Sequence, residues 1–237
     1  MSSHTDQNLP AGYGEIRPVA NYAPWDTDPD FLRVYASIRD NTLVDTYRCY
    51  SLWQLSRQVG NLAGDVLEVG VWRGGTGALL RQALAGANDV KIWLADTFRG
   101  VVKAGPRDDY YKGGEHANTS RTIVESLLAS LGDGAETQIL EGIFPDETGD
   151  EIADIRFRFC HIDVDVYQSA LDVLEWVWPR LTVGGIVVFD DYGFYGCEGV
   201  TALGNELLQT AQNTDADYRF MYNLSGQGVM VKIARKT

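Results

Sequence analysis

The sequence predicts an α/β fold built around one mostly parallel sheet, and three observations lead to this expectation. From residue 65 onward, short apolar runs alternate with stretches of helical length, which is typical of a parallel sheet covered on both faces. The first apolar run ends in a glycine-rich turn, and open α/β sheets bind ligands beyond such strand ends. The last two apolar runs are separated by a short segment with Gly226, which predicts an antiparallel hairpin at one edge.

The N-terminal region precedes the first convincing strand. Residues 1–24 are polar and contain three prolines, so we expect an arm without regular structure. Beyond this arm, apolar residues recur at helical spacing, and we expect helices over 28–40 and 42–60. The chain is therefore predicted to divide into an N-terminal arm with cap helices (1–60) and a main domain (61–237).

The main domain is expected to hold seven strands joined mostly by helices. Strands are predicted at 65–70, 90–96, 137–142, 156–163, 184–191, 218–224 and 228–234, and helices at 75–86, 119–131, 167–181 and 198–211. Asn118 or Thr119 is the expected N-cap of the second of these helices. Residues 97–117 form a long glycine-containing loop. A seven-stranded, mostly parallel sheet ending in an antiparallel hairpin is typical of the class I, Rossmann-like fold of methyltransferases that use S-adenosylmethionine (SAM).

Composition excludes several classes of protein. The 237 residues suit one α/β domain with a short extension. The net charge of −13 argues against nucleic-acid binding, which depends on Lys and Arg. The three cysteines show no CxxC spacing, as expected in a reducing cytoplasm. No signal peptide or apolar stretch of membrane-spanning length is evident, so we expect a soluble cytoplasmic protein without a membrane partner.

The turn after the first strand has features of a SAM-binding loop. Glu68 stands two residues before Gly70, and an acid there suits a ligand with a cationic amine, such as the methionine part of SAM. Gly70 lacks the second glycine of a GxGxxG dinucleotide motif, and the bulky Trp72 and Arg73 follow it, which argues against a nicotinamide dehydrogenase. The alternative for this loop is a plain tight turn into a helix.

The second strand ends at Asp96, and in nucleoside-binding α/β folds an acid there binds both ribose hydroxyls. The third strand ends at Gly142 and Phe144, next to the expected position of the adenine, although Phe144 fits a core position equally well. The complete set of predicted cofactor-binding residues is Glu68, Gly70, Trp72, Arg73, Gly74, Asp96, Phe98, Gly142 and Phe144.

Acidic residues follow two later strands. Asp163 and Asp165 follow the fourth strand, and Asp190 and Asp191 follow the fifth. Clustered carboxylates repel one another unless a cation lies among them, and oxygen ligands suit Mg²⁺. We therefore predict a metal site formed by Asp163, Asp190 and Asp191. The alternative is a set of exposed acids at strand ends with no metal.

The residue two positions after Asp163 is then free to face a substrate. A sugar hydroxyl has a high pKa, which a divalent cation lowers, and a neighbouring carboxylate can accept the proton as the methyl group moves. Asp165 is the predicted general base. His161 is the alternative, but its earlier position on the strand favours a buried structural role.

These segments resemble the macrocin O-methyltransferase family, which methylates sugar hydroxyls of macrolides, aminocoumarins and related antibiotics. The resemblance covers about residues 40–235 and rests on LEVGVWRGG, ADTFRG, TSRTIV, EGIFPDE, HIDVDVYQS and GGIVVFDDYG. It implies a SAM- and Mg²⁺-dependent enzyme in which Asp163, Asp190 and Asp191 hold the metal and Asp165 is the base. It also implies that Glu68 and Asp96 contact SAM.

The acceptor is expected to be a small, glycosylated natural product. The 97–117 loop is the predicted lid, in which Tyr110 and Tyr111 could stack on the acceptor, although a mobile surface loop is an equal alternative. Tyr192 and Phe194 could line the acceptor pocket, whereas His116 is expected to be solvated. Two functional alternatives remain: a catechol-type phenol O-methyltransferase, and a SAM-binding protein without transferase activity. Symmetry alone favours a homo-oligomer.

Overall fold

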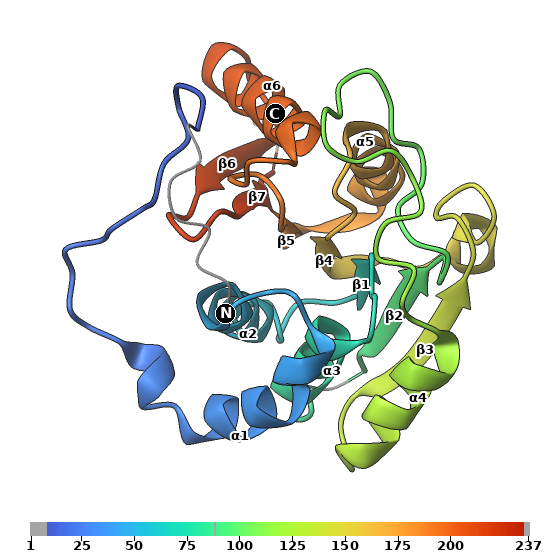
Figure 1. Ribbon diagram of the computed structural model, residues 1–237. Helices are drawn as coiled ribbons and strands as arrows, with labels where there is room; N and C mark the ends of the chain where they lie inside the picture. Colours follow the sequence, from blue (N-terminus) through green and yellow to red (C-terminus); the bar gives the residue numbers. More distant parts are fainter. Residues whose placement is uncertain (1–8, 88, 235–237) are drawn as a thin grey trace.

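The computed structural model describes residues 9–87 and 89–234, and it has a seven-stranded sheet at its centre (Figure 1). The strand order is β3-β2-β1-β4-β5-β7-β6. The strands from β1 to β5 are parallel, and β7 runs antiparallel to both β5 and β6. Their bounds are Asp65–Val69 (β1), Lys91–Asp96 (β2), Glu136–Glu141 (β3), Phe157–Ile162 (β4), Leu181–Phe189 (β5), Tyr218–Tyr222 (β6) and Gly228–Lys232 (β7). The predicted fold class is confirmed.

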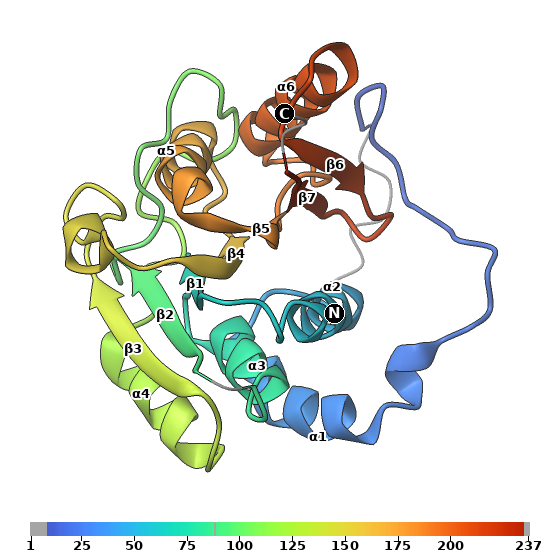
Figure 2. The same cartoon turned by 180° about the vertical axis from the view of Figure 1, so that it is seen from behind.

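Helices cover both faces of this sheet (Figures 1 and 2). Residues that alternate along β1 divide between the two layers: Val66 packs in the core with α1 to α4, and Leu67 packs in the core with α5 and α6. The sheet is thus buried on both faces, as expected of parallel strands. The helices are α1 (Pro29–Ile38), α2 (Thr46–Gln58), α3 (Gly75–Ala83), α4 (Arg121–Ser130), α5 (Tyr167–Val177) and α6 (Glu198–Asn213).

The two cap helices begin at aspartate N-caps. Asp28 accepts a hydrogen bond from the backbone N–H of Phe31, and Asp45 accepts one from that of Tyr47, so α2 begins later than predicted. Phe31 and Leu52 belong to the same hydrophobic cluster as strand residues of the sheet. The boundary predicted at residue 60 stays a prediction, and the outermost parts of both predicted segments, 1–8 and 235–237, lie outside the described residues.

Two local predictions were wrong in detail. The N-cap of α4 is Ser120, not Asn118 or Thr119, because the Ser120 side chain accepts the N–H of Ile123. The helix predicted over 167–181 ends at Val177, where a 3-10 turn (Trp178–Arg180) containing a proline leads directly into β5. The other 3-10 turns are Pro24–Asp26, Arg39–Asn41 and Gly149–Ile152.

The described part of the N-terminal arm runs outside the sheet and its helices (Figure 1). Residues 13–23 form no helix or strand, as predicted. The ring of Tyr13 contacts the ring of Tyr195 edge-on, with 5.5 Å between the centroids. Among the described residues, no helix combines the length and apolar character needed to cross a membrane.

Candidate active site

A cavity of about 320 Å³ opens at the carboxyl ends of the parallel strands. It lies where the strand order reverses, since β1 pairs with β2 on one side and with β4 on the other. Gly70, directly after β1, approaches the backbone of Asp163, directly after β4: a Cβ atom on Gly70 would lie 1.7 Å from the Asp163 carbonyl oxygen. Gly70 also has a φ of +87°, so both its conformation and its surroundings require glycine.

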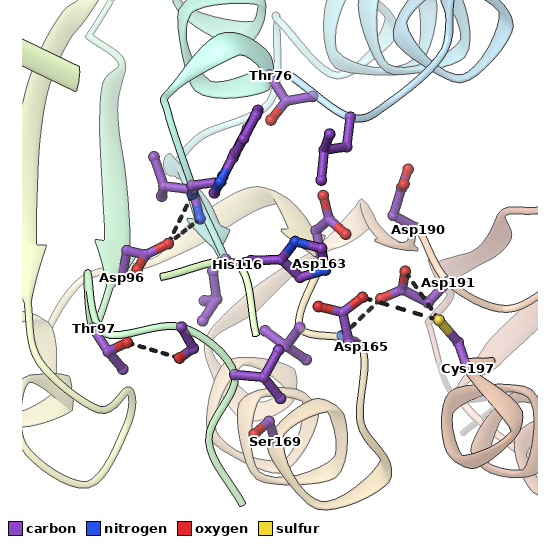
Figure 3. A pocket seen from close by; sticks show the side chains of 18 of the residues that line it. Thr76, Asp96, Thr97, His116, Asp163, Asp165, Ser169, Asp190, Asp191 and Cys197 are labelled. Atoms are coloured by element: carbon purple, nitrogen blue, oxygen red, sulfur yellow. Dashed lines mark hydrogen bonds between the residues drawn. The ribbon is translucent and has the colours of Figure 1, made fainter. Parts of the chain in front are cut away.

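The cavity brings together nine of the fourteen residues proposed from sequence. They are Gly70, Trp72, Asp96, Gly142 and Phe144 on the predicted cofactor side, and Asp163, Asp165, Asp190 and Asp191 on the predicted metal and acceptor side. In Figure 3, Asp96 lies at one side of the cavity and the acids Asp165, Asp190 and Asp191 are grouped at the other. The residues that do not line it are Glu68, Arg73, Gly74, Phe98 and His161.

The carboxylate of Asp96 organises the predicted cofactor loop. Its Oδ2 atom accepts hydrogen bonds from the backbone N–H groups of Val71 (2.7 Å) and Trp72 (2.8 Å), and its Oδ1 atom accepts one from Phe98 (2.6 Å). Trp72 and Phe98 both have positive φ values, +47° and +51°, and these hydrogen bonds hold them in that conformation. Asp96 therefore shapes two loops in addition to facing the cavity.

Trp72 and Arg73 have different positions in this loop. Trp72 lines the cavity, and the Nε1 of its ring donates to Oδ1 of Asn118 at 2.9 Å. Arg73 does not line the cavity; its Nε donates to the carbonyl of Asn118 at 3.1 Å, and its guanidinium lies over the Trp72 ring, 4.9 Å from the centroid. Arg73 thus stabilises the loop through its contacts with Asn118 and Trp72.

The four acids after β4 and β5 form two adjacent groups of possible metal ligands. One group joins Asp163 and Asp190 with His161, and the other joins Asp165 and Asp191 with Cys197; within each group the ligand atoms lie within 4.8 Å of one another. Within the second group, the backbone N–H of Asp165 donates to Oδ2 of Asp191 at 2.9 Å. All four carboxylates line one wall of the cavity, which we call the acid wall.

The electrostatics of this wall differ from acid to acid. Burial raises the pKa values of Asp163 and Asp191 well above their usual range, and the neighbouring carboxylates raise them further. Burial also acts on Asp190, but the charge of Arg48 and the contact with His161 lower its pKa below the usual range. Two of these acids thus lack enough positive charge around them, a situation that a bound divalent cation would relieve.

His161 lies beneath the cavity and is fully buried. It is the cross-strand neighbour of Glu68, and its Nδ1 lies 2.8 Å from Oε1 of that residue, while its Nε2 lies 3.4 Å from Oδ1 of Asp190. Glu68 is equally buried, and its side chain faces Gly77 of α3 rather than the cavity. Neither residue lines the cavity in which an acceptor would bind. Glu68 contacts His161, and His161 contacts Asp190 of the acid wall.

Asp165 has the exposure and surroundings of a reactive group. It lines the cavity and has a φ of +66°. The Tyr111 hydroxyl lies 3.3 Å from Nε2 of His116, and Cys197 Sγ lies 4.0 Å from Oδ1 of Asp165. Burial raises the pKa of Asp165, while the Tyr111 side chain opposes that rise.

Some of the residues proposed to contact the acceptor line the cavity, and others do not. Tyr111 and His116 line the cavity, whereas Tyr110 is 69% exposed. Phe194 lines the cavity, but Tyr192 packs against Phe220 in the core.

The structure adds Arg48 and Cys197, which the sequence analysis did not select. Arg48 comes from α2 and reaches the acids across 142 positions of sequence, so no local motif signals it. Cys197 could have been noticed only from its place six residues after Asp191.

The sheet order, the antiparallel β7 and the cavity over the strand ends define a class I SAM-dependent methyltransferase, and solved structures of this class have the same fold. The O-methyltransferase NovP superposes with a TM-score of 0.66 at 26% identity, covering 82% of this chain and 83% of NovP. The calicheamicin methyltransferase CalS11 superposes with a TM-score of 0.65 at 19% identity, covering 92% and 98% of the two chains, which shows the fold alone. Residues 40–214 match the macrocin-O-methyltransferase (TylF) family, and the chain belongs to that family of O-methyltransferases.

Two curated relatives have related names. A protein of Streptomyces olivaceus, the 8-demethyl-8-(2,3-dimethoxy-alpha-L-rhamnosyl)-tetracenomycin-C 4'-O-methyltransferase, is 32% identical over 192 residues, which are 73% of this chain and 70% of the relative. The demethyldecarbamoylnovobiocin O-methyltransferase of Streptomyces niveus is 31% identical over 169 residues, 64% and 62% of the two chains. The predicted family and enzyme class are confirmed.

Proposed function

We propose that this chain transfers a methyl group from SAM to a sugar hydroxyl of a glycosylated natural product, with Mg²⁺ as cofactor and Asp165 as general base. The observation that carries this proposal is the arrangement of the cavity. The loop organised by Asp96 lies on one side and four carboxylates lie on the other, so a methyl donor and an acceptor would meet between them. The name of the tetracenomycin relative, which specifies a rhamnosyl substituent, supports a sugar acceptor.

The donor set fits a hard divalent cation. Asp163, Asp190 and Asp191 offer only oxygen ligands on one cavity wall, and Mg²⁺ is bound in proteins by a few carboxylates together with water or substrate. The raised pKa values of Asp163 and Asp191 mean that the protein alone leaves these carboxylates short of positive charge. When bound, the ion would lower the pKa of an acceptor hydroxyl and orient it.

The protein residues would then complete the transfer. Asp165 faces the cavity beside the three metal-binding acids, within reach of the same acceptor hydroxyl, and would take its proton. The Tyr111 side chain would lower the pKa of Asp165 and so stabilise the charged carboxylate that acts as the base. On the opposite side, Asp96 would hold the loop that places SAM, and Trp72 and Phe144 would cover the cofactor.

The need for a base separates this function from the catechol-type alternative. A phenol is acidic enough to react with metal assistance alone, whereas an alcohol requires a nearby proton acceptor. Asp165 supplies that acceptor, held at a positive φ next to the metal-binding acids, and this position favours an alcohol. A protein that only bound SAM would need neither group, and membership of an O-methyltransferase family argues further against that alternative.

The test is methyl transfer from labelled SAM to a panel of deoxysugar-bearing natural products and simple catechols, with Mg²⁺ or with EDTA. We expect transfer to a glycoside that EDTA abolishes and that Asp165→Asn reduces by about a hundredfold or more, the usual contribution of a general base. Asp109→Asn is the matched control, since it removes an exposed carboxylate that does not line the cavity. Transfer to catechols alone would overturn the sugar assignment, and full activity in EDTA would overturn the metal site.

A further inference from the structure

One cation of the protein already reaches the acid wall. Arg48, in the first turn of α2, has only 11% of its side chain exposed. Its Nε donates to Oδ2 of Asp45 at 2.8 Å, and its Nη1 donates to Oδ2 of Asp190. The guanidinium also lies over the ring of Phe194, 4.4 Å from the centroid. Arg48 thus connects the start of a cap helix with the end of β5 and the segment after it.

The contacts of Asp190 leave little room for another ligand. Its Oδ1 atom accepts a hydrogen bond from Nε2 of Gln227 at 2.7 Å and faces His161, and its Oδ2 atom accepts the one from Arg48. A divalent cation must approach a carboxylate oxygen to about 2.0–2.1 Å, as Mg²⁺ does. An N–H group on the same oxygen occupies a lone pair that the ion needs, and its positive charge repels the ion.

Arg48 differs from the other side chains that contact Asp190. Gln227 and His161 are fully buried, and both contact Oδ1 of Asp190. Arg48 instead contacts Oδ2, and it lines the cavity itself. Arg48 also has a second anion, Asp45, which is the N-cap of its own helix. The guanidinium can therefore leave Asp190 and keep one ion pair, which makes an exchange with a metal ion feasible.

We propose that Arg48 is an internal counter-cation of the acid wall that competes with the divalent ion for Oδ2 of Asp190. Arg48 stabilises the clustered carboxylates when no ion is bound, and an incoming ion displaces it toward Asp45. The affinity of the site for metal is then set partly by a residue of the N-terminal cap. This inference rests on the proposed metal site and concerns how readily the site takes up its ion.

The test compares Mn²⁺ binding, measured by electron paramagnetic resonance and calorimetry, in the wild type and in Arg48→Met. Competition predicts that Arg48→Met binds Mn²⁺ about tenfold more tightly or better, because the variant removes a positive charge from the site. It also predicts a lower melting temperature than the wild type in EDTA, and a smaller difference at saturating Mg²⁺. A residue that only positioned Asp190 for the metal would give weaker binding when removed.

Two further variants keep the test decisive. Arg48→Lys retains the charge and is expected to bind Mn²⁺ as the wild type does, even if Arg48→Met folds poorly. Arg57→Met is the matched control on the same helix: Arg57 is half-exposed and pairs with Asp28 at 3.8 Å, so Mn²⁺ affinity should not change. Unchanged or weaker binding by a folded Arg48→Met, with Mn²⁺ bound by the wild type and lost in Asp163→Asn, would overturn the competition alone. No Mn²⁺ bound by either protein would overturn the proposed metal site as well.

Discussion

Nδ1 of His161 lies 2.8 Å from Oε1 of Glu68, and both side chains are fully buried beneath the acid wall. The two residues are direct neighbours on β4 and β1, so the sheet register itself brings them together. Burial would lower the pKa of His161, but hydrogen bonds to Asp190 and Glu68 and the charges of both acids raise it to about 10. His161 is therefore a buried cation that stabilises the acids above it, which leaves Asp165 as the candidate base.

This pair predicts a pH-dependent stability. The pKa of His161 is higher in the folded chain than the unfolded value of about 6.5, so its stabilising effect is complete below about pH 6.5 and is lost as the pH rises toward 10. Between these limits the contribution should fall by roughly 1.4 kcal/mol per pH unit. Urea unfolding in EDTA at pH 7, 8 and 9 should show that the stability difference between the wild type and His161→Gln shrinks as the pH rises. A difference independent of pH would contradict a protonated His161.

Tyr111 should set the pH dependence of catalysis. Burial raises the pKa of Asp165, and the Tyr111 hydroxyl opposes this by stabilising the charged carboxylate. Tyr111→Phe removes that hydroxyl, so the pKa of Asp165 should rise. A base works in its deprotonated form, and the acidic limb of kcat/KM should move to higher pH by about one unit, since a hydrogen bond to a charged group contributes about 1.5 kcal/mol or more.

The neighbouring tyrosine supplies the control for this pH profile. Tyr110 is 69% exposed, and its ring contacts that of Tyr111 edge-on, so Tyr110→Phe removes a hydroxyl from the same loop while keeping the ring contact. Its profile should match that of the wild type. Equal shifts in both variants, or no shift in Tyr111→Phe, would contradict the role assigned to the Tyr111 hydroxyl.

The sequence was sufficient for the parts of the site that lie directly after strands. Asp163 and Asp190 come directly after β4 and β5, and because these strands pair in parallel, their ends meet at one edge of the sheet. The same local logic located Asp96 and Gly70. Arg73 and Phe98, which were also predicted to bind the cofactor, do not line the cavity, because a position in a loop does not determine which way a side chain points.

Local sequence patterns could not predict the site contacts that depend on tertiary packing. Arg48 belongs to a helix that shows only an aspartate N-cap and a mixed polar surface in the sequence. Its approach to Asp190 depends on how α2 packs on the sheet, which no motif encodes. The Glu68–His161 contact depends likewise on the pairing of β1 with β4, and that pairing follows from the strand order rather than from either segment alone.

Asp96 should control cofactor binding through the loop that it holds. In Asp96→Asn, one oxygen becomes an amide nitrogen, which cannot accept from all three backbone N–H groups of Val71, Trp72 and Phe98. We expect SAM affinity, measured by calorimetry without acceptor, to fall by about tenfold to a hundredfold. This range corresponds to the loss of about 1.5–3 kcal/mol, the usual contribution of a hydrogen bond to a charged group.

Asp65 is the matched control for Asp96. It also accepts hydrogen bonds from the neighbouring strand, from the N–H of Lys91 at 3.1 Å and from Nε1 of Trp93 at 2.8 Å, but it lies at the opposite end of β1. Asp65→Asn should therefore lower stability while leaving SAM affinity unchanged. A normal affinity in Asp96→Asn would show that the loop keeps its shape without the carboxylate.

Gly70 should tolerate no side chain because of its contact with the strand end that carries Asp163. Two effects act at this position: its φ of +87° disfavours other residues, and a Cβ atom would lie 1.7 Å from the Asp163 carbonyl oxygen. Gly114 has nearly the same φ, +89°, but nothing lies within 4 Å of its Cβ position. Gly114→Ala should thus cost only the conformational term, about 1–2 kcal/mol. Gly70→Ala should lower the free energy of urea unfolding by clearly more, because β1 and β4 must separate. Equal losses in the two variants would mean that the strand ends can move apart freely, and that the acid wall does not depend on this contact.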